Sequence, residues 1–261
     1  MQLAFYKYQG AGNDFVMIDN RTGHLSTLTT DQIAFLCNRN KGVGADGLIL
    51  IEASEKADFK MVYYNADGRE STLCGNGGRC SVAFAANLEI IKTKTCFEAV
   101  DGLHHAEVLP DKLVRLQMAS VLELKTHENA LVLDTGSPHY VTLRDSVRNL
   151  NTTKEGAVIR YSPVFQSEGI NVNFIARAET NTLEIRTYER GVENETLACG
   201  TGAVASALAA DYWNLLGGAN PIKLHALGGT LQVAFEKTSK GYENITLLGP
   251  AEFIFSGTID I

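Results

Sequence analysis

The sequence predicts an α+β protein of two similar domains. Each domain is expected to be a curved mixed β-sheet wrapped around a central helix, with the active site in the cleft between them. Three observations predict this fold: strand-like runs alternate with helical stretches, a glycine-rich cysteine motif occurs twice, and an apolar helical stretch follows each copy. The 261 residues are enough for two domains, and 45% of them are hydrophobic.

The duplicated motif locates the two halves. Glu70–Gly78 and Glu195–Ala203 both read E-x-x-x-C-G-x-G followed by a small residue. Strand-like runs over 59–65 and 182–188 precede them, and Cys74 and Cys199 are 125 positions apart (199 − 74). This offset of about half the chain predicts a repeat with a boundary near residue 118.

The stretches that follow the cysteines predict the central helices. No charged residue occurs in 80–88 or in 200–210, and both stretches are apolar nearly all round. A helix of that composition is buried on every side. The simplest arrangement therefore wraps a curved sheet around each helix and places both cysteines at the cleft, since clefts between domains are preferred ligand sites.

A cysteine at a glycine-rich helix N-terminus has distinctive chemistry. Unpaired backbone N–H groups and the helix dipole lower the pKa of the thiol from about 8.5 toward neutrality, so that it can act as a base or a nucleophile. The same N–H groups bind anions, and the glycines at 75, 77, 78, 200 and 202 allow a carboxylate to approach the backbone. One isolated cysteine could equally be a packing residue; two matched copies favour chemistry.

The remaining cysteines do not suggest a metal site. Cys74 and Cys80 are six residues apart, which places their side chains about 120° apart on a helix, and the chain contains no C-x-x-C or H-x-x-x-H pair. We therefore assign Cys37, Cys80 and Cys96 to packing and expect no metal.

Polar residues flank both cysteine segments. An amino-acid ligand carries an ammonium and a carboxylate group, which require acceptors and donors of these kinds. Each residue alone would be typical of a turn or an exposed surface, and only its position near a cysteine motif suggests binding. The candidates are Asn13, Asn65, Asn171, Glu189, Arg190, Ser137 and His139.

Composition limits the partners. The net charge of −7 without a cluster of Lys or Arg argues against nucleic acid, and no apolar run reaches the ~18 residues of a membrane span. The N-terminus is not typical of a signal peptide, and five scattered cysteines do not suggest a disulfide framework. We expect a cytoplasmic protein with a small-molecule substrate, without nucleic-acid or membrane partners.

The motifs together resemble the diaminopimelate epimerases, a family of pyridoxal-independent two-cysteine racemases and epimerases. The resemblance runs the length of the chain. It rests on the segments Gly10–Phe15, Gly42–Gly47, Asn65–Gly68, Cys74–Cys80, Gly169–Asn171, Tyr188–Gly191 and Cys199–Gly202.

The resemblance implies a homodimer and the interconversion of LL- and meso-diaminopimelate for lysine and peptidoglycan synthesis. It implies a first domain over 1–118, completed by residues 250–261, and a second over 119–249. Cys74 and Cys199 would be the acid/base pair. The substrate would be held by Asn13, Asn65, Asn171, Glu189 and Arg190, and by the backbone donors of Gly75, Asn76, Gly200 and Thr201.

Two positions depart from the family pattern. Ser137 replaces the Asn of many members, and Gly47 replaces a Gln found in some. Ser137 is shorter than Asn, so we expect its contact with the distal group of the substrate to be lost or made through water.

Inverting a carbon centre requires a proton to leave one face and another to arrive on the opposite face, so two acid/base groups must flank it. A thiolate and a thiol that exchange roles satisfy this requirement, and nothing in the sequence indicates a pyridoxal or nicotinamide cofactor. Two alternatives stay open. The chain could be a racemase of another amino acid, of the proline or hydroxyproline type, or a non-catalytic amino-acid-binding or thiol redox-sensing protein.

Overall fold

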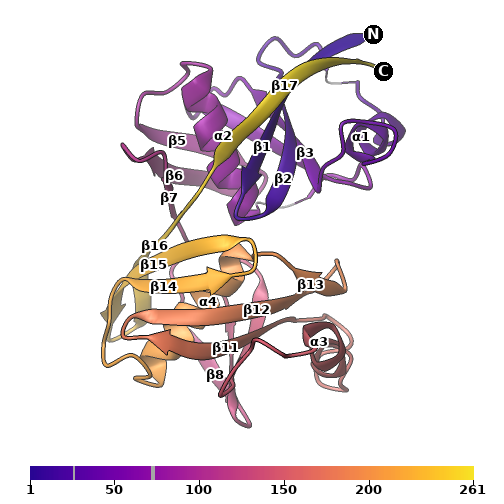
Figure 1. The fold of residues 1–261 in the computed structure, drawn as a ribbon. Coiled ribbons are helices and arrows are strands. Elements are labelled where there is room, and N and C mark those ends of the chain that lie inside the picture. The colour runs from indigo at the N-terminus through magenta and orange to yellow at the C-terminus, as the bar shows by residue number, and fades with distance from the viewer. Residues whose placement is uncertain (26, 72–73) are drawn as a thin grey trace. The chain divides into compact units, whose positions relative to one another are not determined.

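The computed structural model describes residues 1–25, 27–71 and 74–261 of the chain. These residues form two compact units, one made of Met1–Leu116 and Gly249–Ile261 and the other of Gln117–Leu248 (Figure 1). Strands dominate both units, and mixed parallel and antiparallel pairing confirms the predicted α+β class.

The first unit is built on a sheet in the order β17-β1-β2-β3-β4-β5-β6-β7. Two of its pairs, β2–β3 and β4–β5, are parallel, and the others are antiparallel. The chain ends meet here, since the Met1 amino group donates to the Ile261 carbonyl at 2.7 Å. The strands are β1 (Gln2–Gly10), β2 (Asn13–Asp19), β3 (Gly47–Glu52), β4 (Phe59–Asn65), β5 (Lys94–Ala99), β6 (Gly102–Val108), β7 (Val114–Gln117) and β17 (Glu252–Asp260).

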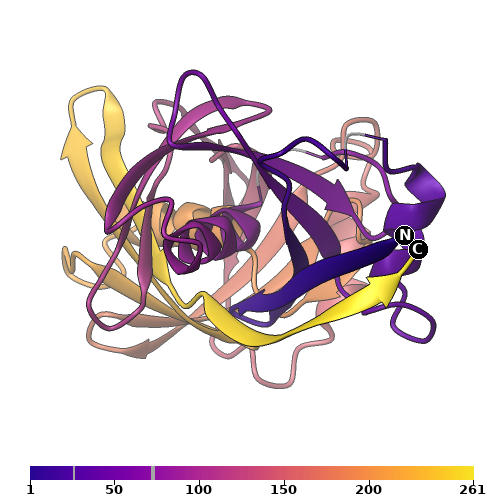
Figure 2. The same cartoon turned by 90° about the horizontal axis from the view of Figure 1, so that it is seen from above.

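Helix α2 (Gly75–Asn87) lies inside this sheet. It packs against β1, β2, β3, β4, β6 and β17, and Figure 2 shows the strands of the unit curving around it. Residues 75–82, Phe84 and Ala85 of the helix are buried, as expected of a helix enclosed by its sheet. Helix α1 (Thr30–Cys37) packs against β3 and begins with a capping box formed by Thr29 and Gln32.

The second unit has a sheet in the order β8-β9-β10-β11-β12-β14-β15-β16, in which β10–β11 and β12–β14 are parallel. Helix α4 (Gly200–Tyr212) packs against β9, β10, β11, β12, β14 and β15, while α3 (Thr152–Arg160) packs against β11, β12 and β13. The strands are β8 (Leu124–His127), β9 (Ala130–Asp134), β10 (Pro138–Leu143), β11 (Asn171–Glu179), β12 (Thr182–Glu189), β13 (Asn194–Thr196), β14 (Ile222–Ala226), β15 (Gly229–Thr238) and β16 (Gly241–Gly249).

The two units repeat one topology. In each, an outer helix joins the second and third of the shared strands, the central helix joins the fourth and fifth, and parallel and antiparallel pairs follow in the same order. The register repeats too, because Phe15 lies opposite Gly47 as His139 lies opposite Asn171. The duplicated cysteine motif is thus the most visible part of a repeat that extends over both sheets.

The central helices start at the cysteine motifs, as expected of cysteines at glycine-rich helix N-termini. They begin at Gly75 and Gly200, directly after the cysteines, so the glycines that follow each cysteine form the first helical turn. Glycine suits these first turns because close neighbours leave little room for a side chain, as at Gly77 and Gly202. Thr72 and Leu73 of the first motif lie outside the described residues. No helix in the described ranges is long and apolar enough to span a membrane.

Candidate active site

Cys74 is the residue that precedes α2. Its backbone is extended (φ −93°, ψ 124°), its side chain is half-buried, and its carbonyl accepts the first helical hydrogen bond, from the Gly78 N–H at 2.7 Å. The N–H groups of Gly75 and Asn76 belong to the first turn, whose amides point out of the N-terminal end of the helix. The Cys74 site therefore combines a thiol with backbone donors suited to an anion.

A directed chain of side chains starts at Arg79, one turn into α2. Arg79 donates to Asn76 Oδ1 at 2.9 Å, so the Asn76 amide nitrogen faces Asn13 and donates to its Oδ1. Asn13 in turn donates to Asp46 Oδ2 at 3.0 Å. The chain fixes the orientation of both asparagines and links a buried cation to a carboxylate.

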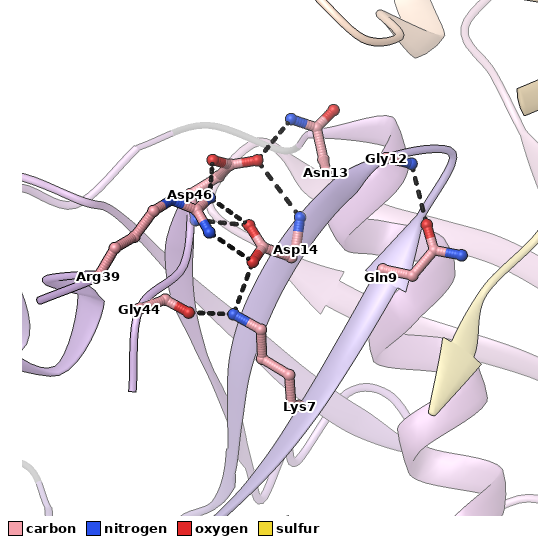
Figure 3. Close-up of polar contacts among 8 residues, drawn as sticks. All are labelled: Lys7, Gln9, Gly12, Asn13, Asp14, Arg39, Gly44 and Asp46. Carbon is pink, nitrogen blue, oxygen red and sulfur yellow. Dashed lines mark hydrogen bonds and ion pairs between the residues drawn. The ribbon is translucent and has the colours of Figure 1, made fainter. Parts of the chain in front are cut away.

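Asp46 belongs to an ion cluster beside the β1–β2 turn (Figure 3). Arg39 contacts both Asp46 and Asp14 at 2.7 Å, and buried Lys7 contacts Asp14 at 2.7 Å. Burial raises the pKa of Asp14, but hydrogen bonds and charges from Arg39 and Lys7 outweigh it and lower this pKa to about 2. The cluster is charged at neutral pH and anchors Asn13.

Cys199 occupies the equivalent position before α4. Its backbone is extended (φ −117°, ψ 117°), and its half-buried sulfur accepts from the Gly202 N–H at 3.4 Å. Thr201 Oγ1 lies 3.4 Å from the same sulfur. Two donor groups thus converge on this thiol within one helical turn.

Buried Asn173 orients a histidine beside the Cys199 site. Asn173 Oδ1 accepts from the Thr187 hydroxyl at 3.0 Å, and its amide nitrogen donates to the Tyr140 carbonyl at 3.4 Å. The same nitrogen lies 2.9 Å from His139 Nδ1. Nδ1 of His139 is therefore the acceptor, and the ring proton is on Nε2.

The position of the proton on His139 determines which hydrogen bond the Cys199 thiol receives. Its Nε2 donates to Thr201 Oγ1 at 2.9 Å, which leaves the Thr201 hydroxyl proton to be donated to Cys199 Sγ. Burial, with the charge of Arg190, lowers the pKa of His139 to about 3, so the ring is neutral at physiological pH. Hydrogen bonds donated to the sulfur favour its thiolate form.

Asn171 connects the remaining predicted residues of the second unit. Its amide nitrogen donates to Ser137 Oγ at 2.8 Å, and its Oδ1 accepts from the Arg190 backbone N–H at 2.8 Å. The Arg190 guanidinium is exposed and donates to the Glu168 carbonyl at 2.9 Å and to Ser137 Oγ at 3.5 Å. Glu189 is the last residue of β12, and a turn begins at Arg190.

Asn65 and Gly47 lie opposite each other where β4 ends and β3 begins. Asn65 is exposed, whereas Gly47 is buried, and a Cβ atom on Gly47 would come within 2.6 Å of the Tyr63 ring. Tyr63 therefore occupies the space that a longer side chain at position 47 would need. Asn65, Gly47 and Asn13 belong to the first unit, while Asn171, Ser137, His139 and Arg190 belong to the second.

Sequence reasoning missed several polar residues around the two cysteines: Arg79, Asp46, Asp14, Asn173 and Thr187. Asn173 had a usable signal, because it follows Asn171 by two positions and so shares its face of the strand. Arg79 lies one residue before the uncharged stretch that begins at Cys80, whereas Asp46, Asp14 and Thr187 make contacts with other segments, which local patterns do not reveal.

The packing cysteines differ in character from the two at helix starts. Burial raises the pKa of Cys37 and of Cys80 to about 12, so both stay protonated, and Cys96 is half-buried on β5. Among the described residues, no three His, Cys, Asp or Glu side chains are grouped to hold a metal ion.

Comparison with known proteins gives consistent family matches. A family model described as diaminopimelate epimerase matches residues 5–121 and 131–254. The diaminopimelate epimerase of Flavobacterium psychrophilum is 51% identical to this chain, over 98% of it and 100% of the relative. That of Chlorobaculum tepidum is 43% identical, over 97% of this chain and 99% of the relative.

Solved structures share the fold at low identity. A phenazine biosynthesis protein of the PhzF family from Bacillus anthracis aligns with a TM-score of 0.76 and 14% identity, covering 100% of both chains. A hydroxyproline epimerase from Agrobacterium vitis aligns with a TM-score of 0.70 and 12% identity, covering 99% of this chain and 92% of that one. These likenesses establish the fold alone.

Proposed function

The chain belongs to the diaminopimelate epimerase family, and on that premise we propose that it interconverts LL- and meso-diaminopimelate. This places it in the synthesis of lysine and of peptidoglycan precursors. The observation that carries the proposal is the repetition of one arrangement in both units: a cysteine directly before a buried helix, on sheets of the same register.

The proposed chemistry uses both thiols on one substrate carbon. A thiolate removes the α-proton from one face, and the other cysteine, present as a thiol, delivers a proton to the opposite face. The product leaves with the two protonation states exchanged, so no cofactor is required to balance the reaction. The mechanism requires each unit to supply one thiol to the same substrate.

The helix starts support this chemistry. Removing an α-proton places negative charge on the substrate carboxylate, and preorganised N–H donors stabilise such charge more strongly than water does. Gly75 and Asn76 supply such donors in α2, as Gly200 and Thr201 do in α4. At Cys199, the Thr201 hydroxyl and the Gly202 N–H favour the thiolate.

The distal end of the substrate carries a second ammonium and carboxylate. We assign Arg190 to the distal carboxylate, and Glu189, with Asn65 and Asn171, to an ammonium. The Asn171 bond to the Arg190 backbone supports this assignment, because it holds the start of the turn at the end of β12. Ser137, half-buried and within reach of Arg190, would contact the distal group directly or through water.

Incubation with LL-diaminopimelate in D2O tests the function. We expect the LL isomer to convert to meso with deuterium entering at the α-carbon, and Cys74→Ala and Cys199→Ala each to abolish conversion while retaining the wild-type circular dichroism. Higher kcat/KM for proline or hydroxyproline would favour the racemase alternative. Absence of deuterium incorporation would indicate a binding or redox-sensing protein.

We propose a homodimer formed through β17. This strand pairs with β1 on one side, and among the described strands no other pairs with it. Phe253, Ile254 and Phe255 are each about half exposed, at 45–50%. An open apolar edge favours addition of another strand, and two copies of one strand pair antiparallel about a twofold axis. Ile254→Lys should yield monomers in sedimentation velocity, whereas Val158→Lys, on the exposed surface of α3, should not.

We also propose that the enzyme works in the cytoplasm. Its chemistry requires Cys74 and Cys199 to be reduced, and thiols persist in that compartment. Fractionation of cells followed by immunodetection tests the location, and recovery outside the cytoplasmic fraction would contradict it.

A further inference from the structure

Arg79 is the one charged side chain of α2, and its surface is fully buried. Each of its three guanidinium nitrogens donates to a neutral acceptor: Nε to the Pro250 carbonyl, Nη1 to the Gly75 carbonyl and Nη2 to Asn76 Oδ1. No carboxylate forms an ion pair with it within 1–25, 27–71 and 74–261. A buried charge without a counter-ion is costly, and an anion formed nearby would offset part of that cost.

The repeat provides a comparison for this position. Arg79 lies five residues after Cys74, and the residue five after Cys199 is Val204, which is also fully buried. Conversely, His139 in the second unit corresponds in register to Phe15 in the first. The first unit thus has a buried arginine where the second has a valine, and the second has the histidine that contacts Thr201 where the first has a phenylalanine.

Of the two thiols that interact with Arg79, only one can ionise to a thiolate near neutral pH. Burial lowers the pKa of the Arg79 guanidinium, while interactions with Cys80 and Cys74 raise it. A guanidinium stays protonated in proteins, so the charge is permanent. Cys80 remains a thiol because burial raises its pKa to about 12. The half-buried Cys74 is therefore the group whose ionisation Arg79 can promote.

The strands around α2 carry other titratable groups. Tyr8 on β1 and Glu252 on β17 interact electrostatically with Cys80. Burial raises the pKa of Tyr8 to about 12, so Tyr8 is neutral at physiological pH, and Glu252 is a carboxylate that would oppose a thiolate. The remaining groups include Asp14 on β2, Glu52 on β3, Tyr63 on β4 and His104 on β6.

We propose that Arg79 is a positioning residue that makes the two thiols unequal, by orienting Asn76 and by favouring the thiolate of Cys74 over that of Cys199 in the resting enzyme. The proposal rests on the proposed two-thiol function. It assigns the resting negative charge to the first unit, where the buried Arg79 replaces the apolar Val204 of the second unit, and it assigns the resting proton to Cys199.

The test measures the ionisation of each thiol directly. Cys199→Ala and Cys74→Ala each leave one of the two thiols, so they do not titrate together. Iodoacetamide alkylation of the remaining cysteine is followed against pH by peptide mass spectrometry. We expect the pH midpoint for Cys74 to be about one unit or more below that for Cys199. A midpoint for Cys74 equal to or above that of Cys199 would overturn the proposal.

Variants at Arg79 separate charge from structure. In the Cys199→Ala background, Arg79→Gln should raise the Cys74 midpoint by about one unit or more, which is about a tenfold slower reaction at pH below the midpoint. Arg79→Lys keeps the charge and should retain a low midpoint. Arg21→Gln removes an exposed charge from the same unit and should change nothing.

A purely structural Arg79 predicts a different outcome: Arg79→Gln would lower the melting temperature without moving the Cys74 midpoint. If the Gln variant does not fold, the order of midpoints with Arg79 intact decides alone. Alkylation does not depend on turnover. A normal order of midpoints without deuterium exchange into diaminopimelate would therefore contradict the proposed function and leave the role of Arg79 standing.

Discussion

His139 Nε2 lies 2.9 Å from Thr201 Oγ1, and this contact sets the direction of the hydrogen bond between the Thr201 hydroxyl and Cys199 Sγ. The two residues are 62 positions apart, on β10 and in the first turn of α4. Because the Thr201 hydroxyl accepts from the ring, its own proton is available to the sulfur.

Thr201→Ala should weaken catalysis by removing that donor. A hydrogen bond to a charged group contributes about 1.5–3 kcal/mol, so we expect kcat/KM to fall by about one to two decades. Thr201→Ser keeps the hydroxyl and should stay within a few-fold of wild type. Equal activity of the Ala and Ser variants would show that the hydroxyl does not act on Cys199.

His139 also predicts a pH dependence of stability. Its pKa falls from 6.5 to about 3 on folding, so the unfolded chain binds the proton more readily. The contribution of neutral, buried His139 to the free energy of unfolding is complete above pH 6.5 and is lost as the pH falls through about 3. We expect the melting temperature of His139→Gln to depend less on pH between 6.5 and 3 than that of wild type. Parallel profiles for the two proteins would contradict this assignment.

Two equivalent glycines should respond differently to substitution. A Cβ atom on Gly202 would lie 2.4 Å from Asn173 Oδ1, whereas one on Gly77 would lie 3.1 Å from the flexible end of Ile49. Gly202→Ala should therefore displace Asn173, lower both the melting temperature and kcat/KM, and disturb the hydrogen bonds that join Asn173, His139 and Thr201. Gly77→Ala should be the milder change in both measurements. The reverse order would argue against the buried position of Asn173.

Much of this arrangement could be predicted from the sequence. The cysteine motif predicted both helix starts, and the uncharged stretches predicted buried central helices, because composition directly reflects burial. Arg79 was overlooked since the uncharged stretch was counted from Cys80, one residue later. Asp46 and Asn173 reach their partners through sheet register and loop packing, which a linear pattern does not encode. The placement of the active site between the two domains stays a prediction.

The ion cluster of the first unit should matter for stability. Asp14→Asn would leave buried Lys7 without its carboxylate partner, and breaking a buried pair in this way costs about 3–5 kcal/mol. Because Asp46 and the Gly44 carbonyl stay nearby, we expect the lower end of this range, a loss of about 3 kcal/mol in the free energy of unfolding measured in urea. The double variant Lys7→Met with Asp14→Asn should recover part of the loss. A double variant as unstable as the sum of both single variants would show that the pair is not coupled.

Arg190 provides the sharpest test of substrate specificity. Its backbone N–H holds Asn171 and would remain in Arg190→Met, so the turn after β12 should persist while the guanidinium is lost. Losing one partner of a desolvated charge pair costs about 2–5 kcal/mol, so kcat/KM for diaminopimelate should fall by roughly two to three decades. Arg177→Met, at an exposed position near the far end of β11, serves as the matched control and should keep wild-type activity. Alkylation of Cys74 and Cys199 should proceed in Arg190→Met as in wild type, because the guanidinium is assigned to the distal carboxylate and not to the thiols. Unchanged turnover in Arg190→Met would remove Arg190 from the binding site, whereas an equal loss in Arg177→Met would trace the effect to overall charge.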